Sequence, residues 1–208
     1  MFQQLIDKKQ EEPSPKTRLL EAGIHLFAEK GYASTPVREI VERAGVTKPV
    51  LYYYFKSKEG LFRSILDEAV AWQEAFIADV FEKPGTALER LIKLYLHVYE
   101  ALMEGHDLFK MIHMLIFGLP QGAPDYDLEQ FHRRMADAVK SIYIEGLARG
   151  EIRSVDQDDV VSMVLGVTDF CFHLDYMHPE TVDPERPERL LRLAFEGLIR
   201  NEKVEHEG

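Results

Sequence analysis

The chain contains 208 residues, of which 46% are hydrophobic and 29% are charged, and its formal net charge is −11. This composition is typical of a globular protein with a sizeable core, and no apolar run is long enough to span a membrane. The single cysteine, Cys171, excludes an intramolecular disulfide and, with an N-terminus that lacks a signal-peptide pattern, favours a cytoplasmic protein.

The N-terminal residues 1–13 are polar and are expected to form a flexible tail. Ser14 then provides an N-cap with a proline at the first helical position, and apolar residues recur at helical spacing until Gly31. A short second helix follows, for which Thr35 is predicted to be the N-cap. A glycine-containing turn ends this helix.

Two further helices are predicted before residue 84. Thr47 is placed to cap a short third helix, and Ser57 is placed to cap a fourth, much longer helix. The apolar stripe of the fourth helix continues to the Pro84-Gly85 pair, which stops it.

The remainder of the chain keeps the helical period. Thr86 begins a capping box for a fifth helix, Asp107 begins a sixth, and a seventh ends at Gly150. Two more helices are expected at about 156–177 and 184–201. No series of short alternating segments indicates a sheet, so we predict an all-α fold of about nine helices.

The stretch "TPVREIVERAGVTKPVLYYYF" has the proportions of a helix-turn-helix. If Leu51 and Phe55 face the core, Val50 and Tyr53 point away from it and Tyr52 projects from the flank. A plain helical hairpin in a larger bundle would show the same spacing, and exposed tyrosines are also enriched at protein-binding surfaces.

The distribution of charge favours a nucleic-acid partner for this end of the chain. Residues 1–63 contain 11 Lys and Arg against 8 Asp and Glu, a net +3, whereas residues 64–208 contain 14 against 28, a net −14. A basic head on an acidic body indicates that only one end meets phosphates.

The segment "TRLLEAGIHLFAEKGYASTPVREIVERAGVTKPVLYYYFKSKEGLF" resembles the N-terminal DNA-binding domain of the TetR/AcrR family of bacterial transcriptional regulators. The resemblance implies a three-helix DNA-binding head at residues 14–63, joined by the long fourth helix to a ligand-binding and dimerisation body at residues 64–208. The body resembles the family only in its helical pattern, and so identifies no ligand.

The resemblance also implies roles for individual residues of the head. Arg38 is a candidate base reader, because arginine can pair bidentately with guanine, whereas tyrosine hydroxyls and lysine ammonium groups suit phosphate oxygens. Tyr54 is expected to pack inside with Phe55. The implied DNA-binding residues are Arg38, Thr47, Lys48, Pro49, Val50, Tyr52, Tyr53 and Lys58.

In the body, the family implies a ligand cavity among the middle helices. For each large apolar side chain taken singly, ordinary core packing is the favoured explanation. The candidates for the cavity are Trp72, Phe76, Tyr95, Tyr99, Met103, His113, Phe117, Met135, Phe170 and His173. The acidic body and its aromatic candidates favour a neutral or cationic hydrophobic ligand, because an anion would need a paired cation.

Other classes of function lack their sequence patterns. The histidines show no metal-binding spacing, and no phosphate-binding glycine loop or nucleophile elbow suggests an enzyme. We therefore predict no cofactor.

The last two helices, within residues 156–201, carry more apolar residues than a terminal hairpin needs. Packing onto the body would account for them, whereas the family implies a four-helix dimer interface that places two recognition helices on the DNA. The resulting expectation is a homodimeric repressor that a small hydrophobic ligand releases from its operator. An activator, or a regulator controlled by a protein partner, is the alternative.

Overall fold

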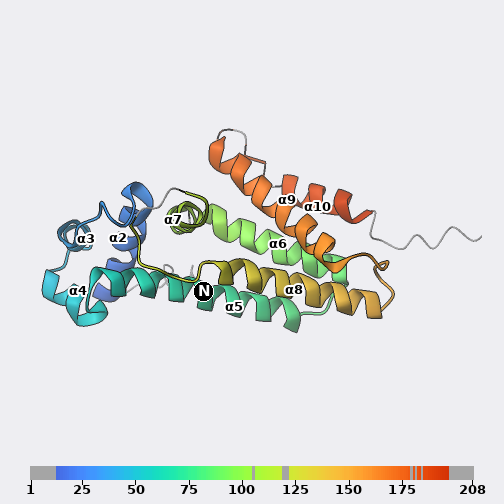
Figure 1. Cartoon of the computed structure of the whole chain (residues 1–208), viewed down its shortest axis with the longest axis horizontal. Helices are drawn as coiled ribbons and strands as arrows, with labels where there is room; N and C mark the ends of the chain where they lie inside the picture. Colours follow the sequence, from blue (N-terminus) through green and yellow to red (C-terminus); the bar gives the residue numbers. More distant parts are fainter. Residues whose placement is uncertain are drawn as a thin grey trace, which may run out of the picture. The chain divides into compact units, whose positions relative to one another are not determined.

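The computed structural model describes residues 13–104, 106–118, 122–178, 180, 182–183 and 185–196. All the secondary-structure elements within these residues are helices, which confirms the prediction of an all-α fold. No helix of this described part is long and apolar enough to cross a membrane. The helices are α2 (Pro15–Lys30), α3 (Val37–Arg43), α4 (Lys48–Phe55), α5 (Lys58–Glu82), α6 (Ala87–Glu104), α7 (His106–Phe117), α8 (Glu129–Ala148), α9 (Gln157–Met177) and α10 (Arg186–Glu196) (Figure 1).

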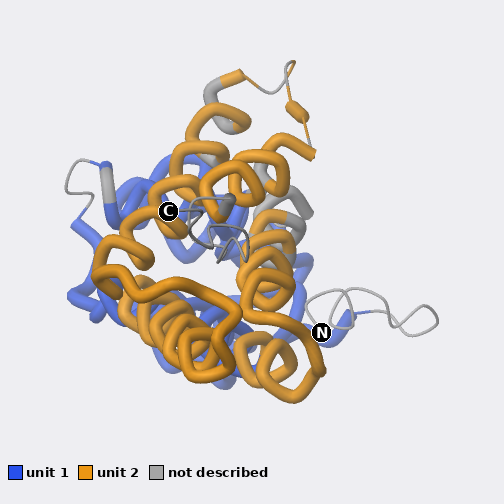
Figure 2. Tube along the Cα trace, turned by 90° about the vertical axis from the view of Figure 1, so that its right-hand side faces the viewer, with its two compact units in different colours: residues 1–75, 105–131 blue, residues 76–104, 132–208 orange. Residues whose placement is uncertain are grey.

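The helices form two compact units (Figure 2). Unit 1 comprises residues 1–75 and 105–131, and unit 2 comprises residues 76–104 and 132–208. The boundary expected at residue 63 stays a prediction about function, since the compact units divide elsewhere.

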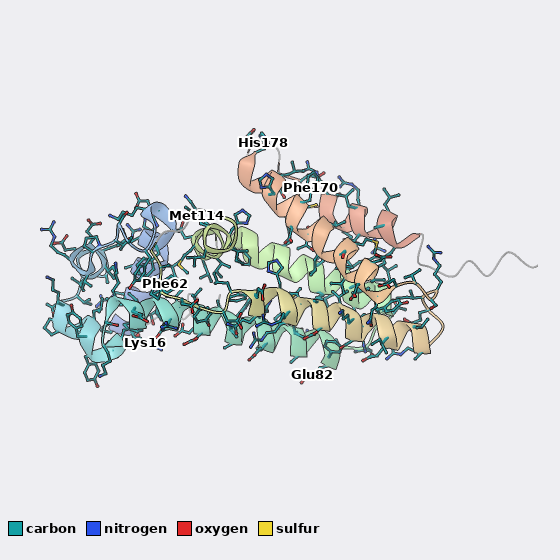
Figure 3. The ribbon with its side chains drawn as sticks, viewed as in Figure 1. Lys16, Phe62, Glu82, Met114, Phe170 and His178 are labelled. Atoms are coloured by element: carbon teal, nitrogen blue, oxygen red, sulfur yellow. The ribbon has the colours of Figure 1, made fainter. Side chains whose placement is uncertain are left out.

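The core of unit 1 is built around three aromatic rings. The ring centroids of Phe27 and Phe62 lie 5.7 Å apart, and those of Tyr32 and Phe62 lie 5.1 Å apart, both in edge-to-face geometry. Phe62 is labelled in Figure 3. Leu51 and Phe55 of α4 are buried in the same cluster, as their four-residue spacing predicts.

Helix α7 completes this core although it is distant in sequence. Its residues Leu108, Met111 and Ile112 are buried in the same cluster, and α7 lies against α2 (Figure 1). His25 Nδ1 on α2 lies 2.7 Å from Asp107 Oδ2 at the start of α7. Unit 1 therefore contains more than the three helices of the expected head.

Unit 2 has its own core, drawn from the end of α5 and from α6, α8, α9 and α10. Helix α10 packs on α6 and α9, and α6 packs on α9. Gly146 lets α8 approach the start of α6, because an added Cβ atom would lie 2.5 Å from Ala87 Cβ.

Three of the predicted helix caps are confirmed. Ser14 Oγ accepts a hydrogen bond from the Thr17 N–H (3.1 Å), and Ser57 Oγ accepts one from the Gly60 N–H (2.9 Å). Thr86 forms the expected capping box, since its N–H donates to Glu89 Oε2 at 2.8 Å. These caps satisfy backbone N–H groups that have no partner within the helix.

The prediction that Thr35 caps the second helix is wrong. Its side chain is buried, and its hydroxyl donates to the backbone oxygens of Gly31 (2.7 Å) and Leu26 (3.2 Å). Pro36 occupies the N-cap position of α3 and makes no side-chain cap bond. Thr35 thus satisfies carbonyl groups at the end of α2 instead of N–H groups at the start of α3.

Candidate functional site

Helices α3 and α4 form the helix-turn-helix that the sequence predicts. The turn between them depends on Gly45, whose φ is +63°. The Val46 N–H then donates to the Val41 backbone oxygen at 3.0 Å, which closes the end of α3. Buried Ile40 and Leu51 fix the two helices on the core of unit 1.

The outward side of α4 displays polar and aromatic side chains. Tyr53 is 73% exposed and Tyr52 is 45% exposed, although both are large aromatic residues. Lys48 and Pro49 are exposed in the first turn. Thr47 occupies the N-cap, yet its side chain makes no cap hydrogen bond to the described backbone, so its hydroxyl is available for another partner.

Two residues of α4 differ from expectation. Val50 is half-buried and packs against the unit 1 core, so the expectation that it points away from the core is wrong. Tyr54 is 40% exposed instead of packing inside, and its ring lies edge-to-face on Tyr53 at 5.0 Å. Because α4 has only two turns, its core-facing side buries Leu51 and Phe55 and accommodates one further residue, Val50, at its edge.

Arg38 lies exposed in the first turn of α3, with its Nε atom 3.3 Å from Glu42 Oε1. Exposed ion pairs of this kind contribute about 0–1 kcal/mol. Such a pair holds the guanidinium only weakly, so a base edge or a phosphate can replace Glu42 as its partner.

Lys58 has a different environment from the other implied DNA contacts. Its ammonium donates to the backbone oxygens of Tyr32 (2.9 Å) and Thr35 (3.0 Å), and lies 4.0 Å from the centroid of the Tyr32 ring. Burial lowers the pKa of Lys58. Its predicted phosphate contact is untested, and these bonds already use two of its three N–H donors.

The structure brings together four of the predicted ligand-binding residues. Phe76, Tyr95, Tyr99 and Met135 are buried in the unit 2 core. Phe170, labelled in Figure 3, and His173 lie on the exposed side of α9 instead.

The other four ligand candidates cannot be placed with that cluster. Trp72 and His113 are half-buried residues of unit 1. The side chains of Met103 and Phe117 lie outside the described residues. The assignment of all ten residues to one ligand site stays a prediction.

A buried polar group on α9 was not predicted. The Tyr99 hydroxyl donates to Asp175 Oδ2 at 2.7 Å, and Arg186 approaches Asp175 Oδ1 at 3.5 Å. Burial and the hydrogen bond to Asp175 raise the pKa of Tyr99. The sequence contains a signal for this buried carboxylate. Thr168, Cys171 and Asp175 are spaced so that they share one face of a helix, and that face is buried.

The helices proposed for dimerisation carry both buried and exposed apolar residues. Val160, Val164 and Leu191 are buried in the unit's own core, whereas Phe170 on α9 and Leu193 on α10 are exposed. Leu198, at the end of the predicted interface, lies outside the described residues, as does the side chain of Phe172.

No group of three or more His, Cys, Asp and Glu side chains in the described ranges is placed to hold a metal ion.

Comparison with known proteins agrees with the helix-turn-helix. A family model described as bacterial regulatory proteins, tetR family, matches residues 19–65. The transcriptional repressor KstR2 of Mycobacterium tuberculosis (strain ATCC 25618 / H37Rv) is 34% identical over 93 residues, which cover 45% of this chain and 46% of KstR2. In that match the chain spans about half the length of its curated relative.

Two further relatives extend over most of the chain. The transcriptional regulator RutR of Escherichia coli (strain K12) is 28% identical over 196 residues, covering 88% of this chain and 90% of RutR. The structure of FadR from Bacillus subtilis in complex with stearoyl-CoA has a TM-score of 0.69 and 26% identity, covering 87% of this chain and 98% of FadR. Residues 19–65 thus match the tetR family of bacterial regulatory proteins, and the all-helical chain as a whole is similar to RutR in sequence and to FadR in fold.

Proposed function

We propose that this chain is a cytoplasmic DNA-binding transcriptional regulator that represses its target genes as a homodimer. The observation that carries this proposal is the outward side of α4, where Tyr52, Tyr53, Thr47 and Lys48 project from a helix held rigidly by buried residues. Tyrosine and threonine hydroxyls, an ammonium group and the N–H groups of a helix N-terminus are suitable partners for DNA phosphates and base edges.

A small molecule is proposed to release the protein from DNA. A ligand can do so only if it prefers the conformation in which the two heads are wrongly spaced for the operator. The buried tyrosines of unit 2 support an effector site there, and the expected effector is a neutral or cationic hydrophobic molecule. We expect no enzymatic activity.

A second class of effector follows from one relative. FadR was solved with stearoyl-CoA, whose nucleotide portion carries several negative charges, and FadR covers most of this chain. An acyl thioester is therefore the alternative ligand, and stearoyl-CoA belongs in any screen beside neutral and cationic compounds.

The proposal is tested by selecting bound sequences from a random DNA pool and measuring affinity at several salt concentrations. We expect sequence-selective binding that weakens steeply with salt. Transcription from a promoter carrying the selected site should fall when the protein is added. An increase would assign activation instead, and binding without sequence preference would refute the proposal.

Replacing Tyr52 with phenylalanine should weaken binding to every DNA sequence by a similar factor, because a phosphate contact carries no base information.

Replacing Arg38 with alanine should instead relax specificity at one base pair, by about 1–3 kcal/mol. Both residues are exposed, so both variants should fold normally. Competition binding with single-base operator variants separates the two results, and a uniform loss for Arg38→Ala would assign that residue to the phosphates.

A further inference from the structure

Two tyrosines of α6, one turn apart, have opposite hydrogen-bonding states. Tyr95 and Tyr99 are both buried, and their rings stack with centroids 6.1 Å apart. The Tyr99 hydroxyl donates to Asp175, whereas the buried Tyr95 hydroxyl has no hydrogen-bond partner among the described residues. A buried hydroxyl without a partner has lost its hydrogen bonds to water without replacing them, so the burial of this hydroxyl requires an explanation.

The neighbouring Cys171 thiol does not satisfy the Tyr95 hydroxyl. The thiol can interact with the hydroxyl only as a weak hydrogen-bonding partner, and no described atom makes a hydrogen bond of acceptable geometry with the hydroxyl. Burial raises the pKa of both groups, so both stay protonated at neutral pH. A protonated thiol is a weak hydrogen-bond acceptor. The Tyr95 hydroxyl therefore lacks a strong acceptor.

The charges near Tyr95 limit what that acceptor can be. Asp175 already pairs with the Tyr99 hydroxyl and the Arg186 guanidinium, so a cationic ligand would compete with both partners. An anionic ligand would meet the buried carboxylate without a cation of its own. An uncharged acceptor avoids both penalties.

We propose that the effector presents an uncharged carbonyl oxygen to the Tyr95 hydroxyl and places its apolar part among the core side chains of α6, α9 and α10. This inference rests on the proposed release by a small molecule, and it narrows the effector to ketones, esters, lactones and amides. Tyr95 would then donate a hydrogen bond to the polar end of the ligand. The hydrogen bond between Tyr99 and Asp175 would hold α9 against α6.

The matched variants Tyr95→Phe and Tyr99→Phe test the hydrogen-bonding difference without any ligand. Removing an unpaired hydroxyl should leave the thermal midpoint of Tyr95→Phe unchanged or higher. Tyr99→Phe breaks a hydrogen bond to a buried carboxylate and should lower the midpoint by roughly 3–12 °C. A comparable loss in Tyr95→Phe would show that protein atoms already satisfy this hydroxyl, and would overturn the proposal.

A chain-length-matched set of probes tests the ligand class by calorimetry, in the absence of DNA. The probes are methyl nonyl ketone, undecane, undecylamine and undecanoate. The ketone should bind about three- to tenfold more tightly than undecane to the unaltered protein, and this preference should disappear in Tyr95→Phe. Undecylamine and undecanoate should bind more weakly than the ketone.

The binding result is separate from repressor function. Failure of the ketone to bind, equal binding of the charged probes, or a ketone preference that survives in Tyr95→Phe would each overturn the proposed recognition. If the protein binds the ketone through Tyr95 and its affinity for DNA is unchanged, the proposed release is contradicted instead.

Discussion

Replacing Leu193 with glutamate should convert the protein to monomers that bind operator DNA roughly 10²- to 10⁴-fold more weakly, because two half-sites are then no longer bound together. Leu193 lies on α10 within the proposed interface and is 64% exposed in the single chain. A charge there should leave the folded subunit intact, whereas burying it unpaired between two subunits would be unfavourable.

Sedimentation velocity measures the oligomeric state of this variant, and gel shifts measure its DNA affinity. Ile144→Glu is the matched control, because Ile144 is an exposed apolar residue on α8, outside the proposed interface. Phe170→Glu provides a second change on α9. If Leu193→Glu and Phe170→Glu remain dimers, or if Ile144→Glu alone dissociates, the interface lies elsewhere.

Replacing Lys58 with methionine should destabilise the protein by roughly 1–3 kcal/mol, because its ammonium bonds to two backbone oxygens at a partly exposed site. The carbonyls of Tyr32 and Thr35 would lose their donors, and the connection between α2 and α3 would loosen. DNA affinity should fall through misplacement of the helix-turn-helix, while the slope of affinity against salt stays the same.

Lys48→Met is the matched control for Lys58→Met, since Lys48 is exposed in the first turn of α4. This control should keep its stability and should reduce the magnitude of the salt slope by about 0.9, as expected for one lost phosphate contact. Denaturant unfolding and salt-dependent binding measure both quantities. The reverse pattern, with a stable Lys58→Met and a smaller slope, would establish Lys58 as a phosphate contact.

The helix caps and the main apolar stripe of α4 were predicted well from local sequence, whereas the orientations of Val50 and Tyr54 were not. Ser14, Ser57 and Thr86 cap their helices as expected, because a cap involves only residues two or three positions away. The burial of Leu51 and Phe55 follows from helical spacing, and the exposure of Tyr52 and Tyr53 follows from the same geometry.

Features that depend on distant packing were not predictable in this way. Thr35 has the sequence context of an N-cap, yet its hydroxyl lies over the end of α2, within hydrogen-bonding distance of the Gly31 and Leu26 backbone oxygens. Lys58 begins a helix and resembles a surface cation, but the Tyr32 and Thr35 carbonyls lie more than twenty positions earlier in the chain. Only the three-dimensional fold brings such partners together.

Only some of the polar residues of the candidate effector site could be predicted from the sequence. Tyr95 and Tyr99 are among the ligand candidates predicted from the sequence. Asp175 was missed because a lone aspartate in an apolar segment is ordinarily assigned to the surface. Its burial depends on partners from two other helices, Tyr99 on α6 and Arg186 on α10.

The burial of α7 in the core of unit 1 limits how this regulator can be divided and recombined. A transplanted fragment that ends at residue 63 would lack Leu108, Met111 and Ile112, and would leave one side of α2 open to water. Such a fragment should aggregate or bind DNA poorly for reasons unrelated to its recognition helix. A working chimera with a new operator preference would have to exchange residues 105–131 together with the head, so the two segments are expected to be inherited as a pair.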